Sequence, residues 1–334
     1  MVFNSIISAY HSFRKFEDGF SSEPWVYWTN DHAEIPVFAV SLYLLMVFQM
    51  PSMLDPKTRP KNLRYIIAAW NGLLAVFSII GFSRLGPALF GMLWNDGFHY
   101  SVCGDVRGKP EATGGPALWM TLFIYSKTPE LVDTLFLILA RKKVIFLHWF
   151  HHTTVLLYCW HAFQNAVSPG VWFATMNYGV HSVMYAYYCA MAFRFRKIAS
   201  HLAPIITILQ ISQMVAGSYV TGYTAQVHSS GQPCFVTPSN YKLGLAMYVS
   251  YFALFCMLFY QKYLAPQPKP AALKVATANG KSNGHSSAHA NGNGSLHDFA
   301  KHTDAGGLFR TDSFSSDVMT PTTPTKDSPK NKDL

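Results

Sequence analysis

The stretch Val144-Ile-Phe-Leu-His148-Trp-Phe-His151-His152-Thr-Thr-Val-Leu-Leu-Tyr-Cys-Trp160 places three imidazole groups inside a long apolar run. A helix turns about 100° per residue, so His148, His151 and His152 are expected on one face. A single histidine in an apolar run is usually a core residue with its hydrogen bonds satisfied. Three on one face of a membrane helix indicate function, because ionisable groups are costly in a bilayer and normally face a cavity or each other.

The composition indicates a polytopic helical membrane protein. Half of the 334 residues are hydrophobic and only 13% are charged, which is about half the charged fraction of an average soluble protein. The net charge of +9 is concentrated beside the apolar runs. That distribution is typical of membrane topology, and no nucleic-acid partner is expected.

Seven long apolar runs predict seven transmembrane helices and therefore an all-α membrane protein. The expected spans are 35–53, 65–82, 116–140, 144–163, 171–193, 202–223 and 241–264. Lysine and arginine crowd the first, third and fifth loops, which the positive-inside rule places in the cytosol. The N-terminus is then predicted on the luminal side and the C-terminus in the cytosol.

Three regions follow from this pattern. Residues 35–264 form the seven-span domain, 1–34 a luminal N-terminal segment, and 265–334 a disordered cytosolic tail of low apolar content. Aromatic and aliphatic residues recur at helical spacing from Phe3 to Phe20. They predict an amphipathic helix on the membrane surface, with a frayed polar terminus as the alternative.

Two cysteines, Cys103 and Cys234, fall in the second and sixth loops, both predicted on the non-cytosolic side. An oxidising compartment favours a disulfide that ties these loops together, and two free thiols are the alternative. The five cysteines of the chain show no metal-ligand spacing.

Three further predicted spans carry polar residues at helical spacing. They are Lys127, Glu130, Asp133 and Thr134 in the third span, Asn177, His181, Tyr185 and Tyr188 in the fifth, and Thr207, Gln210 and Gln213 in the sixth. An ionised carboxylate in lipid is costly unless it is paired, and Lys127 is spaced to pair with Glu130. Counted from the basic loops, the polar stripes all lie within about 20 Å of the cytosolic surface. They predict one polar chamber open to the cytosol, leading to an apolar pocket lined by aromatic residues such as Trp119, Trp160 and Phe173.

Four segments resemble, in order, the four sequence boxes of the very-long-chain fatty acid elongases, the 3-ketoacyl-CoA synthases of the endoplasmic reticulum. These segments are Lys127-Thr-Pro-Glu130-Leu-Val-Asp133-Thr134, His148-Trp-Phe-His151-His152, Asn177-Tyr-Gly-Val-His181-Ser-Val-Met-Tyr185 and Thr207-Ile-Leu-Gln210-Ile-Ser-Gln213. The histidine box alone is a weak signal, since membrane desaturases also carry it. Four boxes in order are specific, and the resemblance covers about residues 35–264.

The resemblance implies condensation of a long-chain acyl-CoA with malonyl-CoA to 3-ketoacyl-CoA, CoA and carbon dioxide, the first step of fatty acid elongation. It also implies seven spans, six of them around an acyl-CoA tunnel, and places the family's luminal disulfide on Cys103 and Cys234. No cofactor or metal is implied. Expected partners are the two CoA substrates and the lipid bilayer, with other elongation-cycle enzymes and a second copy of the chain as candidates.

Site residues follow from the same resemblance. His151 is expected to take the acyl group, with His181 facing it across the chamber and His148 and His152 holding the tautomer or moving protons. The amide of Asn177 or of a glutamine is expected to stabilise the thioester oxyanion. The expected substrate-binding residues are Lys127, Glu130, Asp133, Asn177, Tyr185, Gln210 and Gln213.

Two other classes share parts of the pattern. A di-iron desaturase or hydroxylase would need a richer ligand set, about eight histidines over several boxes. A non-catalytic lipid carrier has no need of a histidine triplet, and no inverted repeat is evident.

Two smaller features refine the assignment. Lys330 and Lys332 resemble a cytosolic dilysine retrieval signal and predict the endoplasmic reticulum membrane, the alternative being a chance pair. The stretch that begins at Lys143 resembles the branch of the family that acts on saturated and monounsaturated chains, of medium to long length.

Overall fold

The computed structural model describes residues 2–105, 107 and 113–266. Within these ranges every regular element is helical, apart from one isolated bridge between Ser21 and Thr113. The helices are α1 Val2–Asp18, α2 Glu23–Asp31, α3 Glu34–Met53, α4 Leu63–Asn95, α5 Gly97–Cys103, α6 Gly114–Ser126, α7 Val132–Leu139, α8 Phe146–Gln164, α9 Gly170–Ala192, α10 Arg196–Ser229 and α11 Pro238–Phe259. Two short elements complete the fold, the 3₁₀ turn η2 (Pro129–Leu131) and the π turn η3 (Tyr260–Leu264).

The protein is an all-helical, multi-pass membrane protein. Four helical stretches of the described chain are long and apolar enough to cross a bilayer, namely Glu34–Met53, Leu63–Asn95, His201–Ser229 and Pro238–Leu264. The other three predicted spans coincide with α6 and α7 together, with α8 and with α9. Polar residues of the sequence boxes interrupt the apolar runs of these helices, and their membrane crossing stays a prediction.

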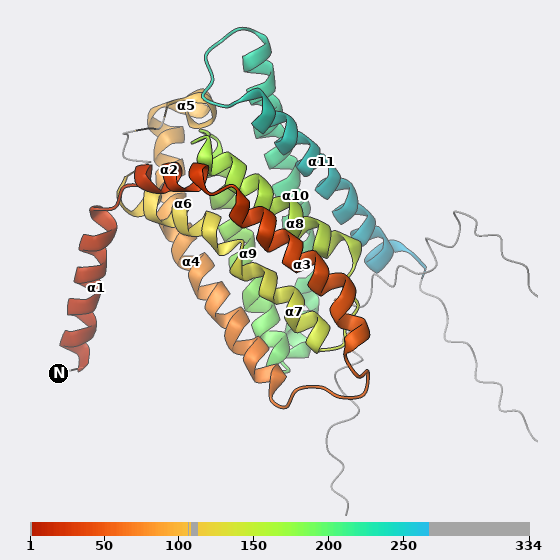
Figure 1. Ribbon diagram of the computed structural model, residues 1–334. Helices are drawn as coiled ribbons and strands as arrows, with labels where there is room; N and C mark the ends of the chain where they lie inside the picture. Colours follow the sequence, from red (N-terminus) through yellow and green to blue (C-terminus); the bar gives the residue numbers. More distant parts are fainter. Residues whose placement is uncertain (1, 106, 108–112, 267–334) are drawn as a thin grey trace, which may run out of the picture.

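The long helices lie side by side in one bundle (Figure 1), and their contacts follow a closed order. Helix α4 packs on α9, α9 on α10, α10 on α11, α11 on α8, α8 on α6, and α6 returns to α4. Helix α3 packs on α7 and α8 and takes no place in this ring. Six described helices therefore follow one another around an interior, and α3 is the long helix that lies outside them.

The third predicted span, 116–140, is not one continuous helix. It divides into α6, η2 and α7. Pro129 lacks a backbone N–H and disfavours helical geometry in the residue before it, so it ends α6 and begins a tighter turn. This break lies between the two halves of the first sequence box.

The N-terminal helix α1 extends away from the bundle, and α2 crosses the end of the bundle, where it packs on α8 (Figure 1). Large apolar side chains of α1, including Tyr10, Phe13 and Phe16, are exposed. The structure thus contains a helix at the predicted place, and its contact with the membrane surface stays a prediction.

One buried carboxylate, Glu17, attaches the end of α1 to α4 and α6. It accepts hydrogen bonds from Arg14, Arg84 and Trp119 at 2.7–3.2 Å. Burial of Glu17 opposes its ionisation, yet hydrogen bonds from Arg84 and Trp119 and the charges of Arg84 and Arg14 hold its pKa below the ordinary value.

A disulfide joins two loops at the end of the bundle opposite the basic loops. Cys103, at the end of α5, forms a disulfide with Cys234 in the loop before α11. The neighbouring Phe235 donates its N–H to the Cys103 carbonyl and accepts from the Ser168 N–H, so three loops are joined. The predicted tail, with Lys330 and Lys332, lies outside the described residues.

Candidate active site

A cavity of about 270 Å³ lies inside the ring of helices. It is lined by His148, His151, His152 and His181 together with Asp133, Tyr185 and Gln210. Two of the four predicted stripes contribute three residues each, and the other two contribute one residue each, Asp133 and Gln210, so all four meet around one chamber. Arg64 and Lys142 line the same cavity from the side of the basic loops.

The histidine box lies in the first turns of α8, which puts its three rings on one side. The ring centroids of His148 and His152 are 4.6 Å apart, and those of His151 and His152 are 5.5 Å apart. The His151 ring also packs against the Tyr251 ring of α11, at 4.9 Å. The one-face prediction from helical spacing matches this arrangement.

Lys127 and Glu130 do not line the cavity. Each has at most 3% of its surface exposed. The Lys127 ammonium donates to Glu130 Oε1 at 2.8 Å and to Asn177 Oδ1 at 3.1 Å, and Ser126 Oγ donates to the same Glu130 oxygen. They form a buried support that contacts Asn177 of α9 through Lys127, and the substrate contact expected of both residues stays a prediction.

This support sets the state of His181. An ammonium can only donate, so Asn177 Oδ1 must accept from Lys127 and Asn177 Nδ2 is free to donate. The Nδ2 atom lies 3.1 Å from His181 Nε2. The network therefore assigns His181 Nε2 as an acceptor and puts the ring proton on Nδ1. Asn177 thus orients His181 through one N–H of its amide, and its expected role toward the thioester oxyanion stays a prediction.

Asp133 connects the chamber to α4. Its Oδ1 accepts from Trp70 Nε1 at 2.6 Å, and its Oδ2 accepts from the Tyr185 hydroxyl at 2.8 Å. The Tyr185 ring packs edge-on against His181, at 5.2 Å between centroids. Sequence reasoning missed Trp70. Its signal is a lone indole N–H in an apolar run, which needs a buried acceptor.

The four histidines differ in how their ring nitrogens are used. His148 Nε2 is 2.8 Å from Thr134 Oγ1, and His181 Nε2 is bonded to Asn177. The rings of His151 and His152 form no hydrogen bond with any residue that the structure describes. Within the chamber, these two rings keep a nitrogen lone pair available for chemistry.

Gln213 and the distal aromatic residues lie elsewhere. Gln213 is buried and does not line the cavity. Trp119, Trp160 and Phe173, expected around an apolar pocket beyond the chamber, are buried, and the pocket itself stays a prediction. The indole of Trp119 donates to Glu17 and that of Trp160 to the Thr29 carbonyl, so the N-terminal segment is hydrogen-bonded to this region.

The basic loop residues have different tasks. Arg141 donates to the carbonyls of Asp55, Thr58 and Ile138 at 2.7–3.2 Å. Its guanidinium is thus used to fix the first loop on the end of α7. Only Arg64 and Lys142, of the basic residues near the chamber, line the cavity.

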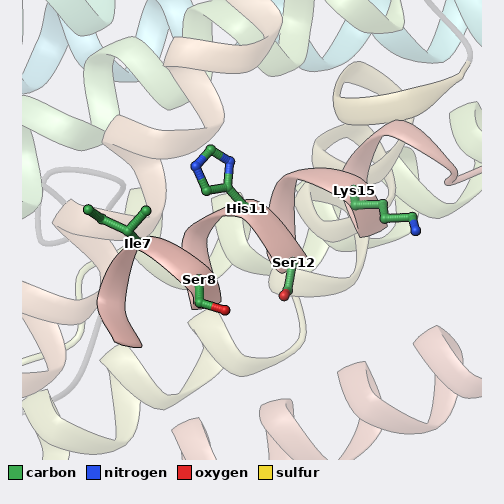
Figure 2. Close-up of a pocket in the computed structure, with 5 residues that line it drawn as sticks. All are labelled: Ile7, Ser8, His11, Ser12 and Lys15. Atoms are coloured by element: carbon green, nitrogen blue, oxygen red, sulfur yellow. The ribbon is translucent and has the colours of Figure 1, made fainter. Parts of the chain in front are cut away.

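A second hollow lies along α1 and is lined by Ile7, Ser8, His11, Ser12 and Lys15 (Figure 2). All five side chains come from one helix, so no second wall encloses a ligand. Within the described part of the chain, no group of three or more His, Cys, Asp or Glu side chains is placed to hold a metal ion.

Comparison with known proteins gives consistent matches over the helical region. Residues 28–271 match the model of the GNS1/SUR4 (ELO) family. The chain is 39% identical over 296 residues to fatty acid elongase 3 of Trypanosoma cruzi, which covers 82% of this chain and 97% of that protein. It is 43% identical over 254 residues to very long chain fatty acid elongase 4 of the same organism, covering 75% and 88%. It is also 37% identical over 266 residues to very long chain fatty acid elongase 6 of Drosophila melanogaster, covering 78% and 82%.

Proposed function

This chain belongs to the GNS1/SUR4 (ELO) family, and from that premise we propose that it condenses a long-chain acyl-CoA with malonyl-CoA. The products are 3-ketoacyl-CoA, CoA and carbon dioxide. The observation that carries the proposal is a single cavity lined by four histidines, in a chain whose relatives are named fatty acid elongases. A carbon–carbon bond formed from two thioesters needs a nucleophile and a donor for the oxyanion, and imidazole serves in either role.

His151 is the proposed nucleophile. It lines the cavity, and its ring has no hydrogen bond that would occupy the lone pair. His181 and His148 each have Nε2 engaged. His152 is buried, with 7% of its surface exposed, whereas His151 is only half-buried, so His151 is the better placed of the two unbonded rings.

The reaction proceeds in two half-reactions. The free nitrogen of His151 attacks the thioester carbonyl, the C–S bond breaks, and the ring N–H proton goes to the departing CoA thiolate. Malonyl-CoA then loses carbon dioxide, and the resulting enolate carbon attacks the acyl-imidazole. The C–N bond breaks and His151 regains a proton from solvent. Splitting one difficult step into two in this way is the usual gain from covalent catalysis.

The entrance supports sequential use of one opening. Arg64 and Lys142 line the cavity from the basic loops, and such cations suit the phosphates of CoA. Both substrates carry the same CoA group, so they would compete for these two cations if they bound together. Departure of the first CoA before malonyl-CoA binds removes that conflict.

The membrane arrangement is part of the proposal. Seven spans, six around the substrate chamber, put the basic loops and Arg64 in the cytosol and the disulfide in the lumen. The endoplasmic reticulum is the proposed compartment, on the dilysine pair in the tail. Saturated and monounsaturated acyl-CoAs of medium to long chain are the proposed substrates, with other elongation-cycle enzymes and a second copy of the chain as partners.

Membranes that contain the protein should be incubated with labelled malonyl-CoA and a panel of acyl-CoAs. We expect label in 3-ketoacyl-CoA two carbons longer than the acyl substrate, and stoichiometric carbon dioxide. A desaturase or hydroxylase would change the acyl chain without incorporating label, and a carrier would bind acyl-CoA without product. Either result would reject the condensation.

A further inference from the structure

Helix α3, which lies outside the ring, reaches a chamber histidine through two hydroxyl groups. The Tyr43 hydroxyl is 2.9 Å from Thr134 Oγ1, and Thr134 Oγ1 is 2.8 Å from His148 Nε2. Tyr43 and Thr134 have 3% and 0% of their surface exposed. Solvent therefore has no access to this chain of hydrogen bonds, and its members must satisfy one another.

Counting protons fixes the direction of the chain. If His148 Nε2 carried the proton and donated to Thr134, the Thr134 hydroxyl would donate to Tyr43, and the buried Tyr43 proton would have no acceptor. In the other direction Tyr43 donates to Thr134, and Thr134 donates to His148 Nε2, so every proton is used. A buried donor without an acceptor costs about 1–3 kcal/mol, which decides for the second arrangement. His148 then carries its proton on Nδ1.

This tautomer gives His148 a definite task. Its ring lines the cavity, and its Nδ1 forms no hydrogen bond with any residue in the described ranges. Asn177, the donor expected from sequence to stabilise the oxyanion, is engaged by Lys127 and His181. The Nδ1–H of His148 is therefore available to a carbonyl oxygen in the chamber, as is the Nδ1–H that the Asn177 contact assigns to His181.

We propose that Tyr43, acting through Thr134, holds His148 as a hydrogen-bond donor toward the substrate thioester carbonyl. Tyr43 is thus a positioning residue, and it belongs to α3, which is not one of the six helices around the chamber. The proposal rests on the proposed condensation, because it assigns a role at that site.

Packing alone does not account for the Tyr43 hydroxyl. Tyr43 belongs to an apolar cluster with Val40, Val47, Leu131 and Leu156, where a phenylalanine ring would pack equally well. Placing a hydroxyl in apolar surroundings is unfavourable unless it forms a hydrogen bond. Among the residues that the structure describes, the only hydrogen-bond partner of that hydroxyl is Thr134, which is also the partner of His148.

The test compares Tyr43→Phe with Thr134→Val, Thr134→Ser and the double variant Tyr43→Phe/Thr134→Val. The control is Tyr125→Phe, which removes an equivalent tyrosine–threonine contact, Tyr125 to Thr29 at 2.8 Å, outside the chamber. We expect Tyr43→Phe to lower kcat for condensation about three- to tenfold with KM for acyl-CoA little changed, the effect of one neutral hydrogen bond. Thr134→Ser should retain activity that Thr134→Val loses, and Tyr125→Phe should resemble the wild type.

The double variant distinguishes a relay from two separate structural effects. If Tyr43 acts only through Thr134, the double variant has the same kcat as Thr134→Val alone. The proposal would be overturned if kcat of the double variant fell by the product of the two single losses. It would also be overturned if Tyr43→Phe and Tyr125→Phe had equal kcat. If Tyr43→Phe does not fold, the Thr134→Ser and Thr134→Val pair still tests the hydroxyl, and equal kcat for these two rejects it. Absence of product from the wild type would instead reject the proposed function.

Discussion

Two regions of this protein bury ionisable side chains, and they use them in opposite ways. At the end of α1, both oxygens of Glu17 accept hydrogen bonds, from Arg14, Arg84 and Trp119, and the residue is fully buried. In the chamber, His151 and His152 line a cavity with rings that are not hydrogen-bonded to described residues. Both regions would be marked as unusual by the same sequence rule for charges near a membrane.

The difference shows which observation separates structure from chemistry. The hydrogen bonds to both oxygens of the Glu17 carboxylate attach α1 to the bundle, so this carboxylate has a structural role. The buried support next to the chamber is only partly paired. Glu130 Oε1 accepts from Lys127, while Oε2 has no partner among the described atoms. The support is therefore hydrogen-bonded at Lys127 and Asn177, which orient His181, and incompletely at Glu130.

The largest effect is expected from Lys127→Met, which breaks the support of the chamber. It leaves Glu130 buried without a cation and frees the Asn177 amide, so His181 loses its orientation. We expect activity to fall at least about 100-fold, as for loss of a positioned acid–base group, and stability to fall by about 3–5 kcal/mol. Condensation rate and thermal unfolding measure the two effects.

A second substitution separates these effects. Lys127→Met/Glu130→Gln removes the unpaired charge and should recover much of the lost stability while activity stays low. Recovery of activity together with stability would mean that the pair serves folding only, as Glu17 does.

Glu17→Gln should alter stability and leave chemistry intact. Loss of charge-assisted hydrogen bonds is worth about 1–3 kcal/mol, and kcat should not change. Because the folded-state pKa of Glu17 lies below its ordinary value of 4.5, the carboxylate contributes its full stability above that value. This contribution disappears as pH falls through the lowered pKa. The melting temperature of the wild type should therefore drop more than that of Glu17→Gln between pH 7 and pH 4, and parallel drops would argue against the assignment.

Two glycines of α4, outside both regions, allow the effect of close helix packing to be tested by itself. A Cβ on Gly81 would lie 2.4–2.6 Å from the Tyr178 ring, whereas nothing lies within 4 Å of a Cβ on Gly91 in the same helix. Gly81→Ala should destabilise by about 1–2 kcal/mol through overpacking of α4 against α9. Gly91→Ala should be neutral or slightly stabilising. Equal melting temperatures for the two variants would show that α4 and α9 are not in close contact.

The smallest effect is expected at the entrance. Arg64→Met should raise KM for acyl-CoA about two- to fivefold, less at high salt, because an exposed ion pair is weak and screened. Arg141→Met should lower the melting temperature without this change in KM, since Arg141 is bonded to loop carbonyls. A larger KM effect at Arg141 than at Arg64 would reverse the assignment of the two arginines.

Much of this arrangement can be read from one sequence, because spacing on a helix is a local property. The one-face placement of His148, His151 and His152, and the pairing of Lys127 with Glu130, follow from i,i+3 and i,i+4 rules. The family match confirms the elongase assignment made from the four boxes. Four stretches meet the criterion for spanning a membrane, and seven spans stay a prediction.

What spacing does not predict is which residues from different helices meet. Tyr43 and Trp70 lie in spans without a polar stripe, so nothing local marks them as partners of Thr134 and Asp133. Helical spacing also does not predict whether aromatic residues such as Trp119 line an apolar pocket or pack against other helices. An aromatic residue in a membrane span suits an open pocket and a packed core equally well, and only tertiary packing decides between them.

The most direct test of acyl transfer to His151 is to supply acyl-CoA without malonyl-CoA. Free CoA and the mass of the purified protein are measured together, with His151→Ala as the test variant and His161→Ala, on the same helix but outside the cavity, as the control. The account predicts release of up to one equivalent of CoA per chain and an acyl group on the peptide that contains His151. The signal should be retained in His161→Ala and lost in His151→Ala. A wild-type protein that condenses both substrates, yet with acyl-CoA alone releases no CoA and gains no mass, would contradict it and make His151 a general base.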